Sequence, residues 1–341
     1  MKKVYIVILN YNNWQDTIEC LESVVRSDYP NFQIIVVDNN STDNSQEYIK
    51  DWINGKIDVW VHPNNKLREL SIPPVKKPIP YVFYNRQEAE EGGNPDIEKN
   101  LDNPIIFIQT GENLGFAGGN NVGIRYALGK NDFEYVWLLN NDTVIRRDTL
   151  SKLINCAQSK DESYGMFGTT LLYYDEPDLV QALGGTFNRF FATGKHKYAH
   201  QKFELVKNNK DIQKFDYIIG ASLLLTKKFI KEVGLLSEDY FIYYEEIDLA
   251  LRAKRKSFKM FICLDSIVYH KESVTIKKNE KQISTFSDYY RVKNRIKLTK
   301  KHNPQYLPII YSGMLFSIYK RIKRKQYKHA KNVLKIMLGM A

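Results

Sequence analysis

The stretch that decides the fold is Tyr135-Val136-Trp137-Leu138-Leu139-Asn140-Asn141-Asp142-Thr143. Its apolar first part is long enough for one buried strand, and it stops at two amides and a carboxylate. Such oxygen ligands at the carboxyl end of a strand occupy the edge where open α/β sheets bind ligands. The alternative is a simple turn that caps a helix predicted from Asp148 to Ala157. The other motifs of the chain decide between the two.

Two further apolar runs end in polar clusters near the amino terminus. Val4 to Leu9 is followed by Asn10-Tyr11-Asn12-Asn13, and Phe32 to Val37 is followed by Asp38-Asn39-Asn40-Ser41-Thr42-Asp43. A helix from about Trp14 to Ser27 separates the runs, and this order predicts parallel strands joined by a right-handed crossover. The polar ends therefore meet at one sheet edge, where an ionised Asp38 can accept hydrogen bonds from a pyrimidine ring or a ribose hydroxyl.

A glycine-rich segment follows the next predicted strand, Ile105 to Ile108. The glycine spacing of residues 111–124 fits neither a dinucleotide-binding motif nor a P-loop. We expect a loop without bulky side chains that opens a helix from Asn120 to Leu128, where backbone N–H groups can approach a diphosphate. Residues 54–103, rich in proline and charge, predict an irregular insertion, in which Tyr81 to Tyr84 is an edge strand or a cover over the site.

Four motifs together resemble the family 2 glycosyltransferases, especially their rhamnosyltransferase-like branch. They are Ile8-Leu9-Asn10-Tyr11-Asn12, Val37-Asp38-Asn39-Asn40-Ser41-Thr42-Asp43, Asn113-Leu114-Gly115-Phe116-Ala117-Gly118-Gly119-Asn120 and Leu139-Asn140-Asn141-Asp142-Thr143. With the motifs of the second half, the resemblance covers roughly residues 4–300, except the insertion. It implies an α/β GT-A fold, with a Rossmann-like mixed or parallel sheet flanked by helices. It also implies an inverting mechanism and a nucleotide-diphosphate sugar donor held by Mg²⁺ or Mn²⁺.

The resemblance also implies roles for individual residues. Asp38 would read the base, and Asp142 would hold the metal. Asn140 stands where many relatives carry a second acid, which leaves a single carboxylate at this place. The residues implied for nucleotide-sugar binding are Asn10, Asn12, Asp38, Asn39, Asn113, Gly115, Gly118, Asn120 and Asn141.

The second half of the chain supplies candidates for the acceptor side and for the catalytic base. Tyr217 to Leu225 predicts a strand whose small residues Gly220 and Ala221 let a sugar approach closely, with packing under a helix as the alternative. Glu245, Glu246 and Asp248 lie beside aromatic residues, which indicates either a solvated helix start or a general base with a raised pKa. The resemblance implies Glu246 as the base, with Glu245 as its substitute. We place Asp248 with Gly220 and Ala221 on the acceptor side.

A last predicted strand, Ile262 to Tyr269, ends at His270. By residue type alone, a single histidine is more often structural than functional. In relatives, a histidine after such a strand binds the metal, so the resemblance implies that His270 supplements Asp142.

The positive charge of the chain is concentrated in its tail. Of the net charge of +11, nine Lys or Arg lie in residues 301–341, which contain no Asp or Glu. The tail follows an apolar stretch, Tyr306 to Tyr319, that is too short to span a bilayer. We expect a helical tail that binds an anionic membrane face, or else one that packs on the domain with a solvated basic side. Nucleic-acid binding is not expected, because a basic sheet with interleaved aromatic residues is missing.

The cysteines and the amino terminus indicate the compartment. Cys20, Cys156 and Cys263 show no paired spacing, so we expect neither a zinc site nor a disulfide framework, and a reducing environment. The short apolar run near Met1 lacks a signal-peptide cleavage site. These features favour a cytoplasmic protein with peripheral attachment to the inner face of the cell membrane.

The combined prediction is a GT-A domain over residues 1–275 and a basic helical region over 276–341. Residues 1–143 would bind the nucleotide sugar and residues 144–275 the acceptor. The donor would be dTDP-rhamnose, with UDP-linked hexoses or galactofuranose as alternatives, and the acceptor a hydroxyl of a cell-surface polysaccharide or lipid-linked glycan. A sugar-1-phosphate nucleotidyltransferase would instead show a basic glycine-rich loop where Asn10 to Asn13 stand. A non-catalytic nucleotide-sugar or glycan-binding protein is the other alternative.

Overall fold

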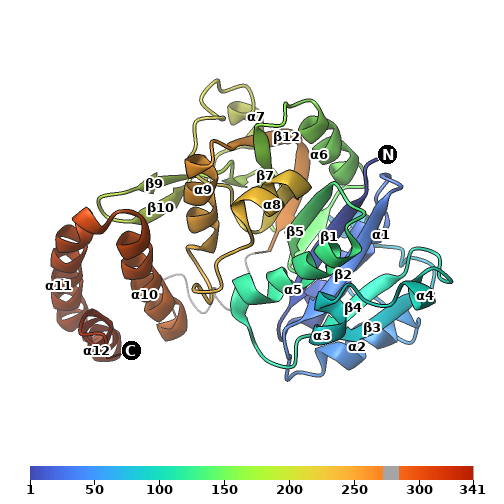
Figure 1. Cartoon of the computed structure of the whole chain (residues 1–341), viewed down its shortest axis with the longest axis horizontal. Helices are drawn as coiled ribbons and strands as arrows, with labels where there is room; N and C mark the ends of the chain where they lie inside the picture. Colours follow the sequence, from blue (N-terminus) through green and yellow to red (C-terminus); the bar gives the residue numbers. More distant parts are fainter. Residues whose placement is uncertain (272–283, 341) are drawn as a thin grey trace.

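One large sheet with helices on both faces positions the polar strand ends (Figure 1). The computed structural model describes residues 1–271 and 284–340. Its amino-terminal half consists of β1 (Val4–Asn10), α1 (Trp14–Val25), β2 (Phe32–Asp38), α2 (Ser45–Ile53), η1 (Arg68–Leu70), β3 (Tyr81–Asn85), α3 (Arg86–Glu90), α4 (Pro95–Glu98), β4 (Ile105–Gln109), α5 (Gly115–Lys130) and β5 (Tyr135–Asn140).

The strands of this half are parallel, as their order in the sequence predicts. β1 lies between β2 and β5, so that Asn10 stands opposite Asp38 and Leu9 stands opposite Asn140. The polar ends of three strands therefore meet at one edge of the sheet. β4 continues the sheet beyond β2, and β3 is a parallel edge strand beside β4. Of the two alternatives for Tyr81 to Tyr84, an edge strand or a cover over the site, the structure has the edge strand.

The second half extends the sheet with mixed strand directions. It consists of β6 (Thr143–Ile145), α6 (Thr149–Gln158), β7 (Tyr164–Tyr173), β8 (Val180–Ala182), β9 (Gly185–Asn188), β10 (Thr193–His196), α7 (Phe203–Val206), β11 (Ser222–Thr226), α8 (Lys227–Val233), α9 (Glu245–Arg255) and β12 (Lys259–His270). The strand order is β3-β4-β2-β1-β5-β11-β7-β12-β6, with β8 beside β7 and a separate β9–β10 hairpin. β6 pairs with the end of β12, which places His270 opposite Thr143.

Each face of the sheet has its own apolar core. On one face, residues of α1, α2 and α6, including Ile18, Trp52 and Leu153, pack against β1 and β5. On the other, residues of α5 and α9, including Tyr126 and Leu249, complete the second core. A strand covered on both faces must be apolar along its whole length, which explains the continuous apolar runs in the sequence.

Two predicted element boundaries are wrong. Helix α5 begins at Gly115 instead of Asn120, so most of the glycine-rich segment is helix rather than open loop. A Cβ at Gly118, Gly119 or Gly123 would lie within 2.7 Å of a side-chain carbon of a neighbouring residue, so these glycines allow close packing. Strand β11 begins at Ser222, which places Gly220 and Ala221 in the turn before it instead of in a strand.

The tail is helical, as predicted, with α10 (Thr285–His302), η2 (Pro304–Tyr306), α11 (Leu307–Lys323) and α12 (Tyr327–Met337). A small core containing Ile296, Ile310 and Val333 joins the three helices, and Ala192 from the β9–β10 hairpin belongs to it. The tail therefore packs on the domain at one end of the molecule (Figure 1). The predicted boundary between residues 275 and 276 lies outside the described residues.

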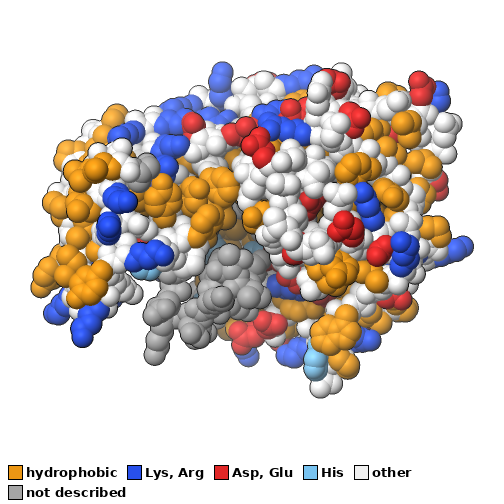
Figure 2. Space-filling model, turned by 90° about the horizontal axis from the view of Figure 1, so that it is seen from below, with side chains coloured by type: hydrophobic (Ala, Val, Ile, Leu, Met, Phe, Trp, Pro, Cys, Tyr) orange, Lys and Arg blue, Asp and Glu red, His pale blue; other side chains and the backbone are white. Residues whose placement is uncertain are grey.

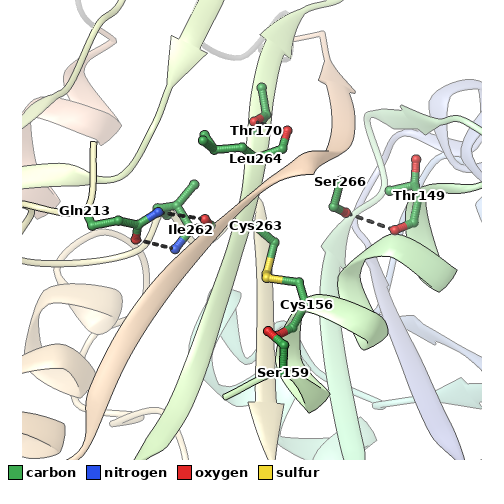
Figure 3. The surroundings of a disulfide bond; sticks show 9 residues. All are labelled: Thr149, Cys156, Ser159, Thr170, Gln213, Ile262, Cys263, Leu264 and Ser266. Carbon is green, nitrogen blue, oxygen red and sulfur yellow. Dashed lines mark hydrogen bonds between the residues drawn. A yellow bond between two sulfur atoms is a disulfide. The ribbon is translucent and has the colours of Figure 1, made fainter. Parts of the chain in front are cut away.

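A disulfide bond joins Cys156 of α6 to Cys263 of β12, with the two Cα atoms 5.9 Å apart (Figure 3). The prediction of unpaired cysteines is therefore wrong for this pair, and only Cys20 has a free thiol. The partners are 107 residues apart in sequence, so their spacing carried no signal. Nearby, Ser266 donates a hydrogen bond to the Thr149 carbonyl, which also links β12 to α6. The expected reducing environment no longer follows from the cysteines.

Candidate active site

The ends of β1 and β2 form a closed network of hydrogen bonds. The Asn10 amide donates to Asp38 Oδ1 over 2.7 Å, and Asp38 also accepts from the Ser41 backbone and hydroxyl and from Gln109. Both Asn10 and Asp38 are fully buried. The Asp38 carboxylate therefore holds the loop after β2, and a base could reach it only if one of these donors gave way. Asn12 is exposed and accepts a hydrogen bond from the Thr42 backbone.

The start of α5 is fixed to both halves of the chain. The Asn39 amide donates to Asn113 Oδ1 and to the Gly115 carbonyl, and the Leu114 N–H donates to Asn39. Gly115 has φ +69, and a Cβ there would collide with the carbonyl oxygen of Phe241. The Phe116 N–H donates to that same oxygen over 2.7 Å. This contact holds the loop after β4 next to the segment that leads into α9.

Asn120 and Asn141 are also engaged in the structure. The Asn120 amide donates to the Phe116 carbonyl within α5. The Asn141 amide donates to Thr17 Oγ1 over 2.9 Å. Thr17 in turn donates to Asn10 Oδ1, so the strand ends of β1 and β5 share one polar network.

Asp142 and His270 meet where β5 passes into β6. Asp142 Oδ1 lies 3.0 Å from His270 Nε2, and both side chains are largely buried. On the opposite side of the imidazole, His270 Nδ1 lies 2.8 Å from Gln181 Oε1 of β8. Because an amide oxygen accepts hydrogen bonds, Nδ1 donates to Gln181, which leaves Nε2 beside Asp142. A neutral ring would offer the Nε2 lone pair to a metal beside Asp142, whereas a doubly protonated ring would donate Nε2–H to the carboxylate.

This pair fits part of a divalent metal site. Ligands about 2.1 Å from a metal on neighbouring octahedral corners lie about 3 Å apart, which matches the Asp142–His270 distance. Across residues 1–271 and 284–340, no group of three or more His, Cys, Asp or Glu side chains is placed to hold a metal ion. Mg²⁺ in phosphate-binding sites is commonly held by one or two protein side chains together with substrate phosphates. The donor set therefore fits a metal that is shared with a diphosphate.

A strained turn presents two glutamates at the start of α9. Tyr243 and Tyr244 have φ values of +68 and +77, a left-handed conformation that costs energy for residues other than glycine. The Asn294 amide of α10 donates to the carbonyl oxygens of Ile242 and Tyr243 and so holds this turn. The turn ends at Glu245, which begins the helix.

The two glutamates have unusual environments. Glu245 is 5% exposed and Glu246 is partly exposed. Within the described part of the chain, one carboxyl oxygen of each is buried without a hydrogen-bond partner. Burial raises the pKa of Glu246 to about 7. Burial, together with the charge of Glu246, raises the pKa of Glu245 well above its ordinary range. A carboxyl with a pKa near neutrality can accept a proton efficiently, and the better access of Glu246 favours it for this role.

The sequence matches known families over most of its length. A family model described as glycosyl transferase family 2 matches residues 5–69, and one described as glycosyltransferase-like family 2 matches residues 85–285. The chain belongs to the family 2 glycosyltransferases. The motifs at the ends of β1, β2 and β5 lie within these two matched regions, as does α9.

Relatives and solved structures agree with this family. The glycosyltransferase is 26% identical to a low-salt glycan biosynthesis hexosyltransferase of Haloferax volcanii over 54% of this chain, and spans 58% of that protein. It is 25% identical to the dTDP-rhamnosyl transferase RfbF of Shigella flexneri, over 64% of this chain and 68% of that protein. A mannosyltransferase from Pyrobaculum calidifontis, solved with GDP-Man and Mn²⁺, is 11% identical but aligns over 99% of this chain and 87% of its own, with a TM-score of 0.51. The fold is GT-A.

Asp248 of the glycosyltransferase is enclosed by groups from α9 and α10. It is fully buried and accepts hydrogen bonds or ion pairs from Arg252, Lys301 and His302 at 2.7–2.8 Å. Burial alone would raise the pKa of Asp248, but hydrogen bonds from His302, Lys301 and Arg252 hold it well below its ordinary range. Asp248 therefore links α9 to the end of α10, and its place on the acceptor side stays a prediction. A Cβ at Gly220 would lie 3.4 Å from the Phe116 ring, and the Ala221 carbonyl accepts a hydrogen bond from the Asn140 N–H.

Three residues of the site were missed by sequence reasoning. Gln181 orients His270, and it comes from a three-residue strand without any motif. Asn294 holds the turn before α9 from a distant helix. Asn121 binds the Leu236 backbone in both directions and so joins α5 to the loop after α8. Of these, Asn121 alone lies beside a recognised motif, Asn113 to Asn120, and this position could have indicated it.

Proposed function

We propose that this glycosyltransferase moves a sugar from a nucleotide-diphosphate donor to a hydroxyl group of a glycan acceptor, with inversion at the anomeric carbon. The supporting observation is the Asp142–His270 pair at the carboxyl edge of the sheet, with Nε2 turned toward the carboxylate. Asp142 and His270 would hold Mg²⁺ or Mn²⁺ together with the donor diphosphate. The bound metal would neutralise the negative charge that builds on the leaving diphosphate.

Glu246 would act as the general base. Its carboxylate would take the proton from the acceptor hydroxyl, whose oxygen then forms a bond to the anomeric carbon from the face opposite the diphosphate. The bond between that carbon and the diphosphate oxygen breaks, and the nucleoside diphosphate leaves with the electron pair. No covalent intermediate with the protein is needed. Glu245 is too enclosed to reach an acceptor directly, and its strongly raised pKa would keep it protonated beside an ionised Glu246.

We favour dTDP-rhamnose as the donor and a cell-surface polysaccharide or lipid-linked glycan as the acceptor. The similarity to RfbF, named as a dTDP-rhamnosyl transferase, supports the donor. The similarity to a hexosyltransferase of glycan biosynthesis keeps UDP-linked hexoses open, and galactofuranose with them.

A thermal-shift panel tests this proposal. The protein is heated with a series of nucleotide sugars, each with and without Mn²⁺, because a ligand that binds the folded state alone raises the midpoint of unfolding. We expect dTDP-rhamnose to give the largest Mn²⁺-dependent increase. If only a UDP-sugar raised the midpoint, that sugar would take the place of dTDP-rhamnose as the proposed donor. If no nucleotide sugar gave a Mn²⁺-dependent increase, the proposal would be contradicted. Turnover of the stabilising donor then separates an enzyme from a non-catalytic binding protein.

A further inference from the structure

The tail helices expose an apolar surface at the end of the molecule farthest from β3. We define the tail face by the exposed apolar side chains of α11 and α12 and of the residue that follows α12. These are Leu315, Phe316, Tyr319, Ile322, Tyr327, Leu334 and Leu338, each between 45% and 63% exposed. Leu315, Tyr319 and Ile322 share one side of α11 by their spacing, while Ile310 and Met314 point into the small core. Seven exposed apolar side chains on two helices are more than the scattered single apolar residues that are normal on a protein surface.

Positive charge surrounds this apolar surface. Exposed basic side chains on and between the two helices are Lys320, Lys323, Arg324, Lys325, Lys328, Lys331 and Lys335. The last acidic residue of the sequence is Asp288, so no carboxylate side chain within the tail face can balance them. Figure 2 shows orange and blue side chains interspersed at the left end of the molecule, where Figure 1 places α11 and α12.

We infer that the tail face binds the surface of a membrane that contains anionic lipids. Aromatic and aliphatic side chains with interleaved lysines are the pattern of helices that lie in a lipid–water interface. In the described residues, 1–271 and 284–340, the structure contains no helix that is long and apolar enough to cross a membrane. A pair of helices that lies on the membrane surface agrees with the apolar and basic pattern and does not need a spanning helix.

The charges argue against other occupants of this face. A second copy of the chain would bring seven exposed cations against seven others, and like charges at an interface oppose association. A soluble polyanion would neutralise the lysines but would leave the apolar side chains in water. An anionic bilayer accommodates both kinds of side chain.

The tail is firmly joined to the helix that carries Glu246. Asp288 of α10 pairs with Arg321 of α11 and with His329 of α12, which fixes the tail face to α10. At the other end of α10, Lys301 and His302 bind Asp248 of α9. A membrane bound at the tail face would therefore stand in a fixed relation to α9, and would present membrane-bound acceptors to it in one orientation. The binding itself does not depend on the proposed function.

Vesicle sedimentation of the full chain tests the inference. The lipids are phosphatidylcholine alone, or phosphatidylcholine with about one third phosphatidylglycerol, in about 0.1 M salt. We expect binding to the anionic vesicles and at least about tenfold weaker binding to the neutral ones. Two variants change the tail face: the triple variant Leu315→Ser, Phe316→Ser, Tyr319→Ser, and the triple variant Lys320→Gln, Lys323→Gln, Lys325→Gln. Each should weaken anionic-vesicle binding by about tenfold or more.

A matched control makes the same change of charge elsewhere. The triple variant Lys66→Gln, Lys76→Gln, Lys210→Gln removes three exposed lysines from the body of the protein, and should bind like the unaltered chain. Equal loss in this control would overturn the inference, because any basic surface would then suffice. Absence of sedimentation with anionic vesicles would also overturn it. So would a dimer seen by light scattering that the serine variant abolishes while vesicle binding is unchanged.

Discussion

Single side chains determine whether the sheet edge can hold a metal and a diphosphate. Asp142 would supply the carboxylate, and His270 would supply Nε2, because its Nδ1 donates a hydrogen bond to Gln181 Oε1. Asn140, where an acid would add a second charge, lies 3.4 Å from His270 Nε2 through its amide. The site therefore has little negative charge of its own, and its metal affinity should depend strongly on the bound donor.

Gln181 is expected to set the tautomer of His270. In the variant Gln181→Leu, the Nδ1 proton loses its acceptor, and loss of such a partner typically weakens metal binding about 10- to 100-fold. Calorimetry of Mn²⁺ binding in the presence of nucleoside diphosphate measures this effect. Nitrogen NMR of histidine-labelled protein without metal reads the tautomer directly, with His270→Asn for assignment. Gln181→Glu, which keeps an acceptor, is the control, and an unchanged His270 spectrum in Gln181→Leu would refute the role.

The pH dependence of transfer should reflect Glu246. Its raised pKa, about 7, means that the carboxyl is mostly protonated at about pH 6 and mostly ionised at about pH 8. Since the base must be ionised to accept a proton, kcat/KM should rise through this range and then level off. The measurement is the initial rate at low donor concentration with Mn²⁺ across these pH values. A rate that is flat from about pH 5 upward would show an unshifted base.

The turn before α9 shows how one element positions another. Tyr243 and Tyr244 adopt left-handed backbone conformations directly before Glu245, and Asn294 of α10 accounts for their stability through two hydrogen bonds. The asparagine is only 1% exposed, so its loss would leave two carbonyl oxygens in this region without their donor.

The variant Asn294→Ala should therefore lower both stability and turnover. Loss of buried hydrogen bonds of this kind costs about 1–3 kcal/mol. Urea unfolding gives the free energy, and the rate of transfer shows whether Glu246 remains in place. Asn208→Ala, at an exposed position, serves as the comparison and should change neither value. Full activity in Asn294→Ala would mean that the turn holds its conformation without α10.

The disulfide between α6 and β12 should contribute clearly to stability. It closes a loop of about one hundred residues, and removal of native disulfides typically costs about 2–5 kcal/mol. We expect Cys156→Ser to lower the free energy of unfolding within that range, measured in urea under oxidising conditions. Cys20→Ser removes a buried free thiol and is the control for loss of a cysteine side chain. If reductant left the stability of the unaltered protein unchanged, the bond would not be contributing.

Some of these features follow from the sequence and others do not, for physical reasons. Asn10, Asp38 and Asp142 were predictable because each follows an apolar run, and the carboxyl ends of parallel strands must meet at one edge. The role of Gln181 was not predictable, because β8 is only three residues long and forms by pairing with β7. Local patterns also cannot reveal which distant groups surround a carboxylate, and for this reason the pairing of Asp248 with Lys301 and His302 of α10 was not predicted.

In the whole molecule, the amino-terminal half and the tail both contact α9 or the segment that leads into it. The amino-terminal half reaches it through the contact of Gly115 and Phe116 with Phe241, and the tail reaches it through Asp248 and Asn294. The position of Glu246 thus depends on elements from the beginning, the middle and the end of the chain. Glu246 therefore lies in the first turn of α9, directly after the strained turn at Tyr243 and Tyr244.

The central claim is that Glu246 is the base of a metal-dependent sugar transfer. It is tested most directly by comparing Glu246→Gln with the unaltered enzyme, using the stabilising nucleotide sugar and Mn²⁺. General-base catalysis contributes about 10²- to 10⁴-fold, so turnover should fall by about that factor while Mn²⁺-dependent donor binding, measured by calorimetry, stays the same. Turnover by Glu246→Gln within a few-fold of the unaltered enzyme would contradict the claim.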